Sequence, residues 1–221
     1  MGSITEVTVW LLPVVISITL HEAAHGYAAL RFGDDTALRA GRVSLNPLRH
    51  VDLYGTIIIP AVLLFSGAPF LFGYAKPVPV NFWRLNNPKR DMVWVAAAGP
   101  AMNILLAVIS ALLFHTLGVL PPWMSGWVAE NLANSVQINA VLAVFNMLPL
   151  PPLDGGRVAV GLLPRALSNP LARLERWGLA IIVGVLFLLP MISRNLDVAP
   201  WLLGRPIDAL IRVITTVTGL S

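Results

Sequence analysis

The residues of this chain that could do chemistry are concentrated in the pentapeptide His21-Glu22-Ala23-Ala24-His25. On a helix, positions i and i+4 project from the same face, so His21 and His25 can bind one zinc ion together. Glu22, next to the first histidine, is placed to act as a general base on a water molecule. The chemistry that this spacing indicates is metal-assisted hydrolysis of a peptide bond.

An apolar stretch surrounds the pentapeptide. From Val7 to Leu20 only Thr8, Ser17 and Thr19 are polar, and mostly apolar residues continue beyond the pentapeptide. A soluble helix can carry the same motif by chance on a polar face, but this stretch is long enough to cross a bilayer. Ionisable side chains inside a membrane are costly and usually functional. The pattern therefore favours a metal site at membrane depth.

The composition predicts an all-α polytopic membrane protein. Of the 221 residues, 57% are hydrophobic and only 12% are charged, and the mean hydropathy is +0.76. With no Cys in the chain, a metal must be bound by His and carboxylate side chains. The net charge of +4 is modest and the basic residues fall in predicted loops, so no nucleic-acid partner is expected. No linker or repeat is visible, and residues 1–221 are interpreted as one integral-membrane domain.

The elements that must position the pentapeptide are predicted from apolar runs and their breaks. A core of three membrane-spanning helices is expected at 7–31, 92–120 and 131–148, with a loop at 121–130 and a further C-terminal span at 177–192. A short helix is expected at 157–163. Alternation over 40–45 suits a short membrane-associated strand. The tail, 206–220, is predicted to be an amphipathic helix at the membrane interface, with one apolar face made by Ile207, Leu210, Ile211 and Ile214.

The apolar segment Tyr54 to Phe72 can be interpreted either as a full span or as a re-entrant hairpin. A full span would put the two basic loops that flank it on opposite sides of the membrane, which the positive-inside rule disfavours. A re-entrant hairpin bent at Gly67 and Pro69 keeps both loops in the cytoplasm and leaves 121–130 outside. We therefore favour the hairpin. The basic residues concerned are Arg39, Arg42, Arg49, Lys76, Arg84, Lys89 and Arg90.

A hydrolytic zinc ion usually has three protein ligands and one position for water, so the pentapeptide needs a third ligand. His50 lies in a basic loop, where a surface role is expected, and His115 is predicted at the outer end of its span, at the wrong depth. Asp154 follows a helix break at the inner end of a span, and the prolines and glycines around it could aim its carboxylate inward. From the residues alone, a plain Leu-Asp-Gly-Gly turn capped by Asp154 is an equally good interpretation.

Three motifs, in this order, resemble the site-2 protease family of intramembrane zinc metalloproteases (peptidase family M50), in a compact form without a PDZ domain. They are the pentapeptide, Gly99-Pro100-Ala101-Met102-Asn103, and Asn146…Pro149…Leu153-Asp154-Gly155. The resemblance implies His21, His25 and Asp154 as ligands of one Zn²⁺ ion and Glu22 as catalytic base. It also implies a polar, substrate-facing role for Asn146. The chain differs from better-studied members in lacking a PDZ insertion and an extra N-terminal span, which bears on substrate recognition.

Two asparagines lie in the predicted core. Asn103 belongs to a stripe with Gly99, Ala107 and Ala111, repeated every four residues, which favours close helix packing and an interhelical hydrogen bond rather than catalysis. Asn146 is a candidate catalytic residue, because its amide could donate to the substrate carbonyl as charge develops there. An interhelical hydrogen bond is an equally open role for Asn146.

The function expected is that of an intramembrane zinc endopeptidase acting in or near transmembrane segments of membrane proteins. Its site would face the cytoplasmic side of a prokaryotic plasma membrane. The resemblance implies a single-span substrate, often one already trimmed by another protease. Two alternatives remain: a metal or proton transporter, although no mirror-related second half is visible, and an inactive scaffold that binds membrane proteins, although ligands and base are all present.

Overall fold

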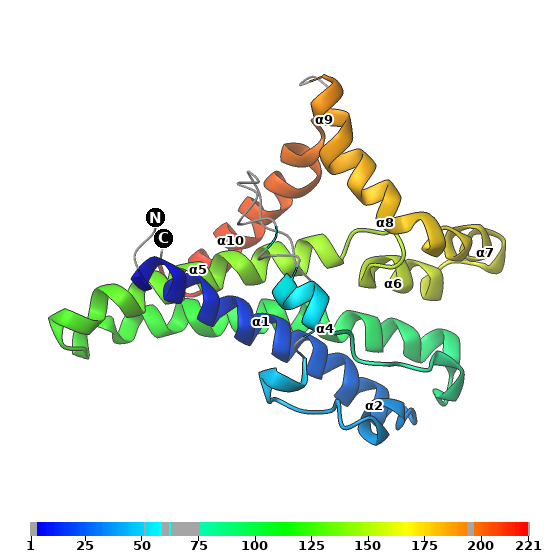
Figure 1. The fold of residues 1–221 in the computed structure, drawn as a ribbon, viewed down its shortest axis with the longest axis horizontal. Coiled ribbons are helices and arrows are strands. Elements are labelled where there is room, and N and C mark those ends of the chain that lie inside the picture. Colours follow the sequence, from blue (N-terminus) through cyan, green and yellow to red (C-terminus); the bar gives the residue numbers. More distant parts are fainter. Residues whose placement is uncertain (1–3, 51, 59–61, 63–75, 194–196, 221) are drawn as a thin grey trace.

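The computed structural model describes residues 4–50, 52–58, 62, 76–193 and 197–220. Within these residues the chain is mostly helical and contains no sheet. Three long helices, α1 (Ile4–Arg31), α4 (Pro88–Leu113) and α5 (Pro122–Asn146), pack against one another and form the body of the molecule (Figure 1). The predicted all-α class is confirmed.

Helix α4 occupies the centre, where it packs against α1, α5 and α6 (Asp154–Leu162). The stripe predicted on this helix is buried at each of its positions, which are Gly99, Asn103, Ala107 and Ala111. Small side chains let helix backbones approach closely where lipid supplies no hydrophobic drive between them. This close approach brings α4 directly against the pentapeptide on α1.

Among the residues that the structure describes, three segments are long and apolar enough to cross a membrane: Thr8–Arg31, Pro88–Val119 and Glu175–Ile192. They match three of the four predicted spans, and the second is α4 continued by the 3-10 helix η4 (Phe114–Val119). Helix α5 has 25 residues but is too polar to belong to this set. Its polar side chains bond to neighbouring helices: Asn134 Nδ2 donates to the Val9 carbonyl at 2.9 Å, and Ser135 and Ser110 share a hydrogen bond of 2.7 Å.

The loop predicted for 121–130 is wrong, because α5 begins at Pro122 and these residues form its first turns. Proline suits the first helical turn, where a backbone N–H has no helical partner to lose. The absence of Lys and Arg had indicated an external loop, but a segment without basic residues is equally compatible with the start of a helix. The connection between α4 and α5 is therefore η4 and a tight turn.

The strand predicted for 40–45 is also wrong. After the short helix α2 (Thr36–Arg39) the backbone turns at Gly41, where φ is +65°, and pairs with no strand in the described residues. Side chains bind the neighbouring backbone in place of a strand ladder. Buried Arg42 donates to the carbonyls of Arg49, Lys76 and Pro77, the last two at 2.5 and 3.5 Å.

An extended coil at residues 76–81 runs beside α1, ahead of the 3-10 turn η3 (Phe82–Arg84). Its first carbonyls are held by Arg42. At its other end, the Asn81 N–H donates to Oδ2 of the fully buried Asp34 at 2.7 Å. Next to it, the hydrogen bond from Arg39 holds the pKa of Asp35 below its usual range. These contacts fix the coil against the C-terminal end of α1, which is predicted to face the cytoplasm.

The predicted re-entrant hairpin at 54–72 lies mostly outside the described residues. The 3-10 turn η1 (Pro47–Arg49) precedes it, and the π-helical turn η2 (Leu53–Ile58) covers its first residues, 54–58. The choice between a hairpin and a full span therefore stays a prediction.

The C-terminal part starts with α6, which begins at Asp154, three residues before the predicted start. It continues through α7 (Arg165–Arg173), α8 (Glu175–Val183), η5 (Gly184–Leu188) and α9 (Leu189–Ile192), and ends with η7 (Pro200–Gly204) and α10 (Arg205–Val217). Figure 1 shows α8 and α9 rising away from the three-helix body and α10 returning to it.

The amphipathic pattern of the tail helix is confirmed. Ile214 of α10 is buried with Ala107, Ala111 and Val136, so its apolar face lies against α4 and α5. The position of α10 relative to a membrane surface stays a prediction.

Candidate active site

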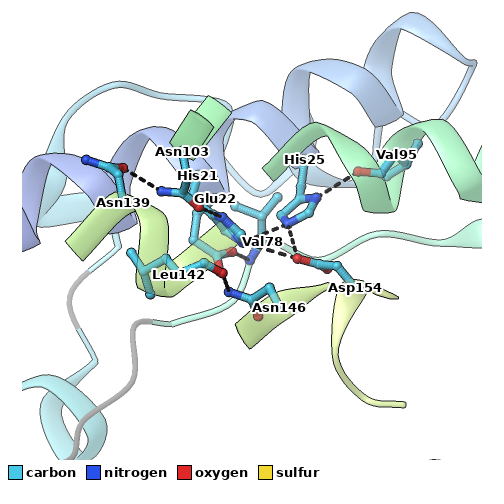
Figure 2. Close-up of polar contacts among 10 residues, drawn as sticks. All are labelled: His21, Glu22, His25, Val78, Val95, Asn103, Asn139, Leu142, Asn146 and Asp154. Atoms are coloured by element: carbon cyan, nitrogen blue, oxygen red, sulfur yellow. Dashed lines mark hydrogen bonds and ion pairs between the residues drawn. The ribbon is translucent and has the colours of Figure 1, made fainter. Parts of the chain in front are cut away.

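Three side chains from the predicted ligand set meet at one place. His21 and His25 lie one turn apart on α1, with their Nε2 atoms 3.1 Å from each other. Asp154 places Oδ2 3.3 Å from both Nε2 atoms. Figure 2 shows the two imidazoles and the carboxylate converging on one point. Within the described ranges, this is the one group of three His, Cys, Asp or Glu side chains close enough to share a metal ion.

Asp154 reaches the histidines because α5 ends at Asn146 and the chain turns back at once into α6. The two residues after Asp154 must be glycines for this turn to close. A Cβ atom on Gly155 would lie 2.2 Å from the Met147 carbonyl oxygen, and one on Gly156 would lie 2.1 Å from the Pro151 nitrogen. No side chain fits at either distance. The tight turn leaves Asp154 at the first position of α6, buried and directed at α1.

Gly99 of α4 forms the wall behind the imidazoles. A Cβ atom there would lie 2.4 Å from His25 Nε2 and 2.6 Å from His21 Nε2. The helix backbone therefore comes as close to the rings as van der Waals contact allows. The sequence predicted a packing role for Gly99, and the structure adds that the packing partner is the candidate metal site itself.

Each imidazole is held through its other nitrogen. His25 Nδ1 lies 2.8 Å from the Val95 carbonyl, and His21 Nδ1 lies 2.6 Å from Asn103 Oδ1. The interhelical role predicted for Asn103 is thus confirmed, with a histidine as its partner. A backbone carbonyl only accepts, so His25 Nδ1 carries the hydrogen, and in the neutral ring Nε2 directs a lone pair at Asp154. Such outer contacts commonly fix the rings of metal-binding histidines.

The donor set fits a catalytic zinc ion. Oδ2 of Asp154 is buried without a hydrogen-bond partner, although it faces the lone pair of His25 Nε2 at 3.3 Å. Two electron-rich atoms in a buried place repel each other unless a proton or a metal cation lies between them, and a metal ion can be shared by all three side chains at once. Two histidines and one carboxylate are a common ligand set of hydrolytic zinc, which leaves the fourth position for water.

Glu22 lies in the same cleft as the two histidines. The cleft has a volume of about 300 Å³ and is bounded by α1, α4, the end of α5, the start of α6 and the coil at 76–81. The backbone N–H of Val78 donates to Glu22 Oε2 at 2.7 Å, across from the candidate ligands (Figure 2). The coil therefore holds the carboxylate of the predicted base in a defined orientation.

Two further polar side chains line the cleft. Asn146 Nδ2 donates to the Leu142 carbonyl of its own helix at 3.0 Å. Arg157, which belongs to none of the three sequence motifs, places its guanidinium 5.1 Å from the centre of the Phe82 ring. Arg157 is thus a cleft residue that sequence reasoning missed.

The two remaining histidines lie elsewhere. The surface role expected for His50 is wrong: the side chain is only 2% exposed, because the turn at 41–50 closes over it and its Nε2 donates to the Ser44 carbonyl at 2.9 Å. His115 Nε2 donates to the Thr218 carbonyl at 2.7 Å and joins η4 to the end of α10. Neither side chain belongs to the candidate metal group.

Comparisons with known proteins point to one family. The family model described as "Peptidase family M50" matches residues 9–136 and 122–191. The protein named "Putative zinc metalloprotease YwhC", from Bacillus subtilis, is 39% identical over 186 residues, which are 82% of this chain and 80% of that protein.

More distant relatives carry similar names. "Putative zinc metalloprotease Rip2" of Mycolicibacterium smegmatis is 31% identical over 186 residues, 84% of this chain and 67% of the relative. "Putative zinc metalloprotease MJ0611" of Methanocaldococcus jannaschii is 29% identical over 157 residues, 71% of each chain. No solved structure matches this chain.

Proposed function

Because the chain belongs to peptidase family M50, we propose which of its side chains carry out proteolysis and what each contributes. The protein is a zinc metalloprotease of the site-2 protease type, which acts within the membrane. One observation supports the assignment of the site above all others. Two imidazole nitrogens of α1 and a carboxylate oxygen of α6 converge in a cleft that Glu22 also lines.

His21, His25 and Asp154 would hold the zinc ion through Nε2, Nε2 and a carboxylate oxygen. When bound, the ion would acidify a water molecule and polarise the carbonyl of the scissile bond. Gly99 leaves room for the two rings, while Asn103 and the Val95 carbonyl orient them.

Glu22 is the proposed general base. The Val78 N–H occupies Oε2, so we assign the proton transfer to Oε1. This oxygen accepts a proton from the attacking water and later delivers it to the nitrogen of the leaving amine. The hydrogen bond at Oε2 keeps the carboxylate from rotating away from the cleft during both transfers.

Asn146 is the proposed donor to the substrate carbonyl oxygen. Its amide nitrogen carries two hydrogens, and one is donated to the Leu142 carbonyl. The second can be donated to the carbonyl oxygen as negative charge develops on it. Because the first bond holds the amide in place, little reorganisation is needed when substrate binds.

The proposed substrates are transmembrane segments of membrane proteins. A membrane helix encloses its carbonyls in hydrogen bonds between residues i and i−4, so the substrate must unwind locally before Glu22 and Asn146 can reach a peptide bond. Residues that weaken a helix near the cleavage point are expected to favour cutting. Protein substrate and lipid bilayer are the expected partners, and no nucleic acid is expected.

We further propose that residues 1–221 act as one domain in a prokaryotic plasma membrane, with the cleft toward the cytoplasm. The basic residues of the segments next to the cleft support this orientation, because Lys and Arg are retained on the cytoplasmic side. Arg42, Arg84 and Lys89 are among them.

The proposal is tested with purified protein, a model single-span substrate and two variants. Wild type should bind one zinc ion and cut the substrate, and a chelator should abolish cutting until zinc is restored. Glu22→Gln should still bind zinc but lose cutting by at least about 100-fold, as expected when a general base is removed. Asp154→Asn should lose zinc affinity, because the amide offers a weaker neutral ligand.

Two results would contradict the assignment. Zinc binding without cutting in the wild type would favour an inactive scaffold. Ion flux through proteoliposomes that depends on Glu22, again without cutting, would favour a transporter.

A further inference from the structure

We propose that Asn139 of α5 is a positioning residue for the metal centre, acting through Asn103 to fix the ring of His21 with Nε2 directed at the metal. This inference rests on the proposed zinc site and extends it from α1, α4 and α6 to α5. The residue lies outside the three sequence motifs and touches neither the candidate ligands nor the cleft.

The contact path runs across three helices (Figure 2). Asn139 Nδ2 donates to the Ser135 carbonyl at 2.9 Å. Asn103 Nδ2 donates to Asn139 Oδ1 at 2.8 Å. Asn103 Oδ1 then meets His21 Nδ1 at 2.6 Å. Each link joins a nitrogen and an oxygen at hydrogen-bond distance.

The direction of every link follows from the backbone carbonyl at the start of the path. The Ser135 carbonyl can only accept, so the Asn139 amide must present its NH₂ group there and its Oδ1 to Asn103. Asn103 must then direct its own NH₂ group at Asn139 and its Oδ1 at His21. Because this oxygen also only accepts, His21 Nδ1 must carry the hydrogen. In the neutral ring, Nε2 is left with the lone pair that a metal requires.

Burial makes this ordering strict. Asn103 and Asn139 are both 0% exposed, so water cannot replace a lost partner. Rotating either amide by half a turn would place two acceptors or two donors against each other in a buried place, which is costly. Only one arrangement of the two amides gives every polar atom of the path a hydrogen-bond partner. In that arrangement, His21 Nε2 has a free lone pair for the metal.

His25 needs no such support, because its Nδ1 bonds directly to the Val95 backbone carbonyl. The two histidines therefore differ in what orients them, a backbone group for His25 and a side chain for His21, and this difference can be tested by mutation. A side-chain substitution cannot remove the contact that orients His25, whereas the contact that orients His21 depends on two asparagine side chains. The effect of Asn139 should appear through His21 alone.

The test measures zinc affinity of detergent-purified protein by competition with a chromophoric chelator. Asn139→Leu removes both amide contacts at nearly constant volume and should lower zinc affinity about tenfold, the lower end of the effect of outer contacts at metal sites. Asn134→Leu is the matched control. Asn134 lies on the same helix and also bonds across to α1, at the Val9 carbonyl, without touching the path to His21. Its zinc affinity should equal that of the wild type.

A double-mutant cycle separates positioning from general loosening. Asn103→Leu should lower zinc affinity at least as much as Asn139→Leu, and the double variant should bind no more weakly than Asn103→Leu alone, because the two residues act in series. Additive losses, or equal affinities of Asn139→Leu and Asn134→Leu, would overturn the proposal.

Asn139→Ala provides a smaller change in case the leucine variant does not accumulate. Failure of the proposed function gives a different result, since the wild type itself would then bind no zinc. A wild type that binds zinc together with an Asn139→Ala variant of unchanged affinity would reject the role of Asn139 alone.

Discussion

Gly99 lies opposite the two histidines, where α4 packs against α1. In a Gly99→Ala variant the new Cβ would lie 2.4 Å from His25 Nε2 and 2.6 Å from His21 Nε2, so rings or helix must move. Because both rings are also held through Nδ1, the movement must break one of those bonds or displace Nε2. We expect zinc affinity and cleavage to fall about 100-fold, the upper range for disturbed outer contacts.

Gly126→Ala is the matched control for this variant. Gly126 lies in α5, and a Cβ atom there would meet nothing within 4 Å. Alanine favours a helix over glycine by up to about 1 kcal/mol, so this variant should be at least as stable as the wild type. Chelator competition and thermal unfolding measure both effects. A Gly99→Ala variant with wild-type zinc affinity would show that the two imidazole rings do not require a glycine at this position of α4.

At the scale of single residues, the sequence predicted candidate site residues wherever they lie close together in the chain. His21, Glu22 and His25 follow from spacing on one helix. Asp154 required a turn that brings distant segments together, and the residues alone left it open between a ligand and a cap. The Val78 N–H and the Val95 carbonyl could not be predicted from residue type, because every residue other than proline offers the same two groups.

The coil at 76–81 is the element that holds the predicted base, and Arg42 holds the coil. Its guanidinium donates to the carbonyls of Lys76 and Pro77, directly before the N–H of Val78 that binds Glu22. In Arg42→Ala these carbonyls lose a buried charged donor and the coil should loosen. We expect kcat to fall about tenfold with zinc affinity unchanged, which is less than the ~100-fold or more lost with the base itself, because Glu22 is still present.

Arg39→Ala is a suitable comparison, because Arg39, at the end of α2 close before Arg42, is an exposed arginine that pairs with Asp35. Exposed ion pairs contribute little, so its kcat should stay near wild type. Zinc titration and steady-state cleavage separate the two outcomes. An Arg42→Ala variant that loses zinc and activity in parallel would place Arg42 among the supports of the metal site rather than of Glu22.

At the scale of elements, prediction succeeded for long apolar helices and failed where backbone contacts are long-range. The alternation at 40–45 is typical of a strand, but a strand must pair with another through backbone hydrogen bonds. Here the carbonyls of Lys76 and Pro77 bind the side chain of Arg42 instead. The start of α5 was placed too late because its first turns contain Ser125 and Gly126 and interrupt the apolar run. Helix α5 itself is polar for a reason that periodicity does not reveal, since Asn134 and Asn139 bond to other helices.

The whole molecule has two ends, separated by α4 and its continuation. Pro88–Val119 has 32 residues, and at ~1.5 Å per residue it exceeds the ~30 Å hydrocarbon core of a bilayer. Val95 and Gly99 contact the histidines, so the candidate site lies toward the N-terminal end of α4. The turn between η4 and α5 lies at the opposite end. The orientation of the protein therefore decides from which side water reaches the cleft.

This orientation can be tested cleanly because the chain has no Cys of its own. Trp83, ahead of α4, is 89% exposed, and Trp123, at the start of α5, is 81% exposed, so a Cys at either position should be reachable. In intact bacterial cells, a membrane-impermeant maleimide should label Trp123→Cys but label Trp83→Cys only after lysis. The physical reason is the retention of basic segments in the cytoplasm, and Arg84, Lys89 and Arg90 all follow Trp83 closely. Labelling of Trp83→Cys in intact cells, with Trp123→Cys protected, would invert the molecule and place the cleft on the outer side.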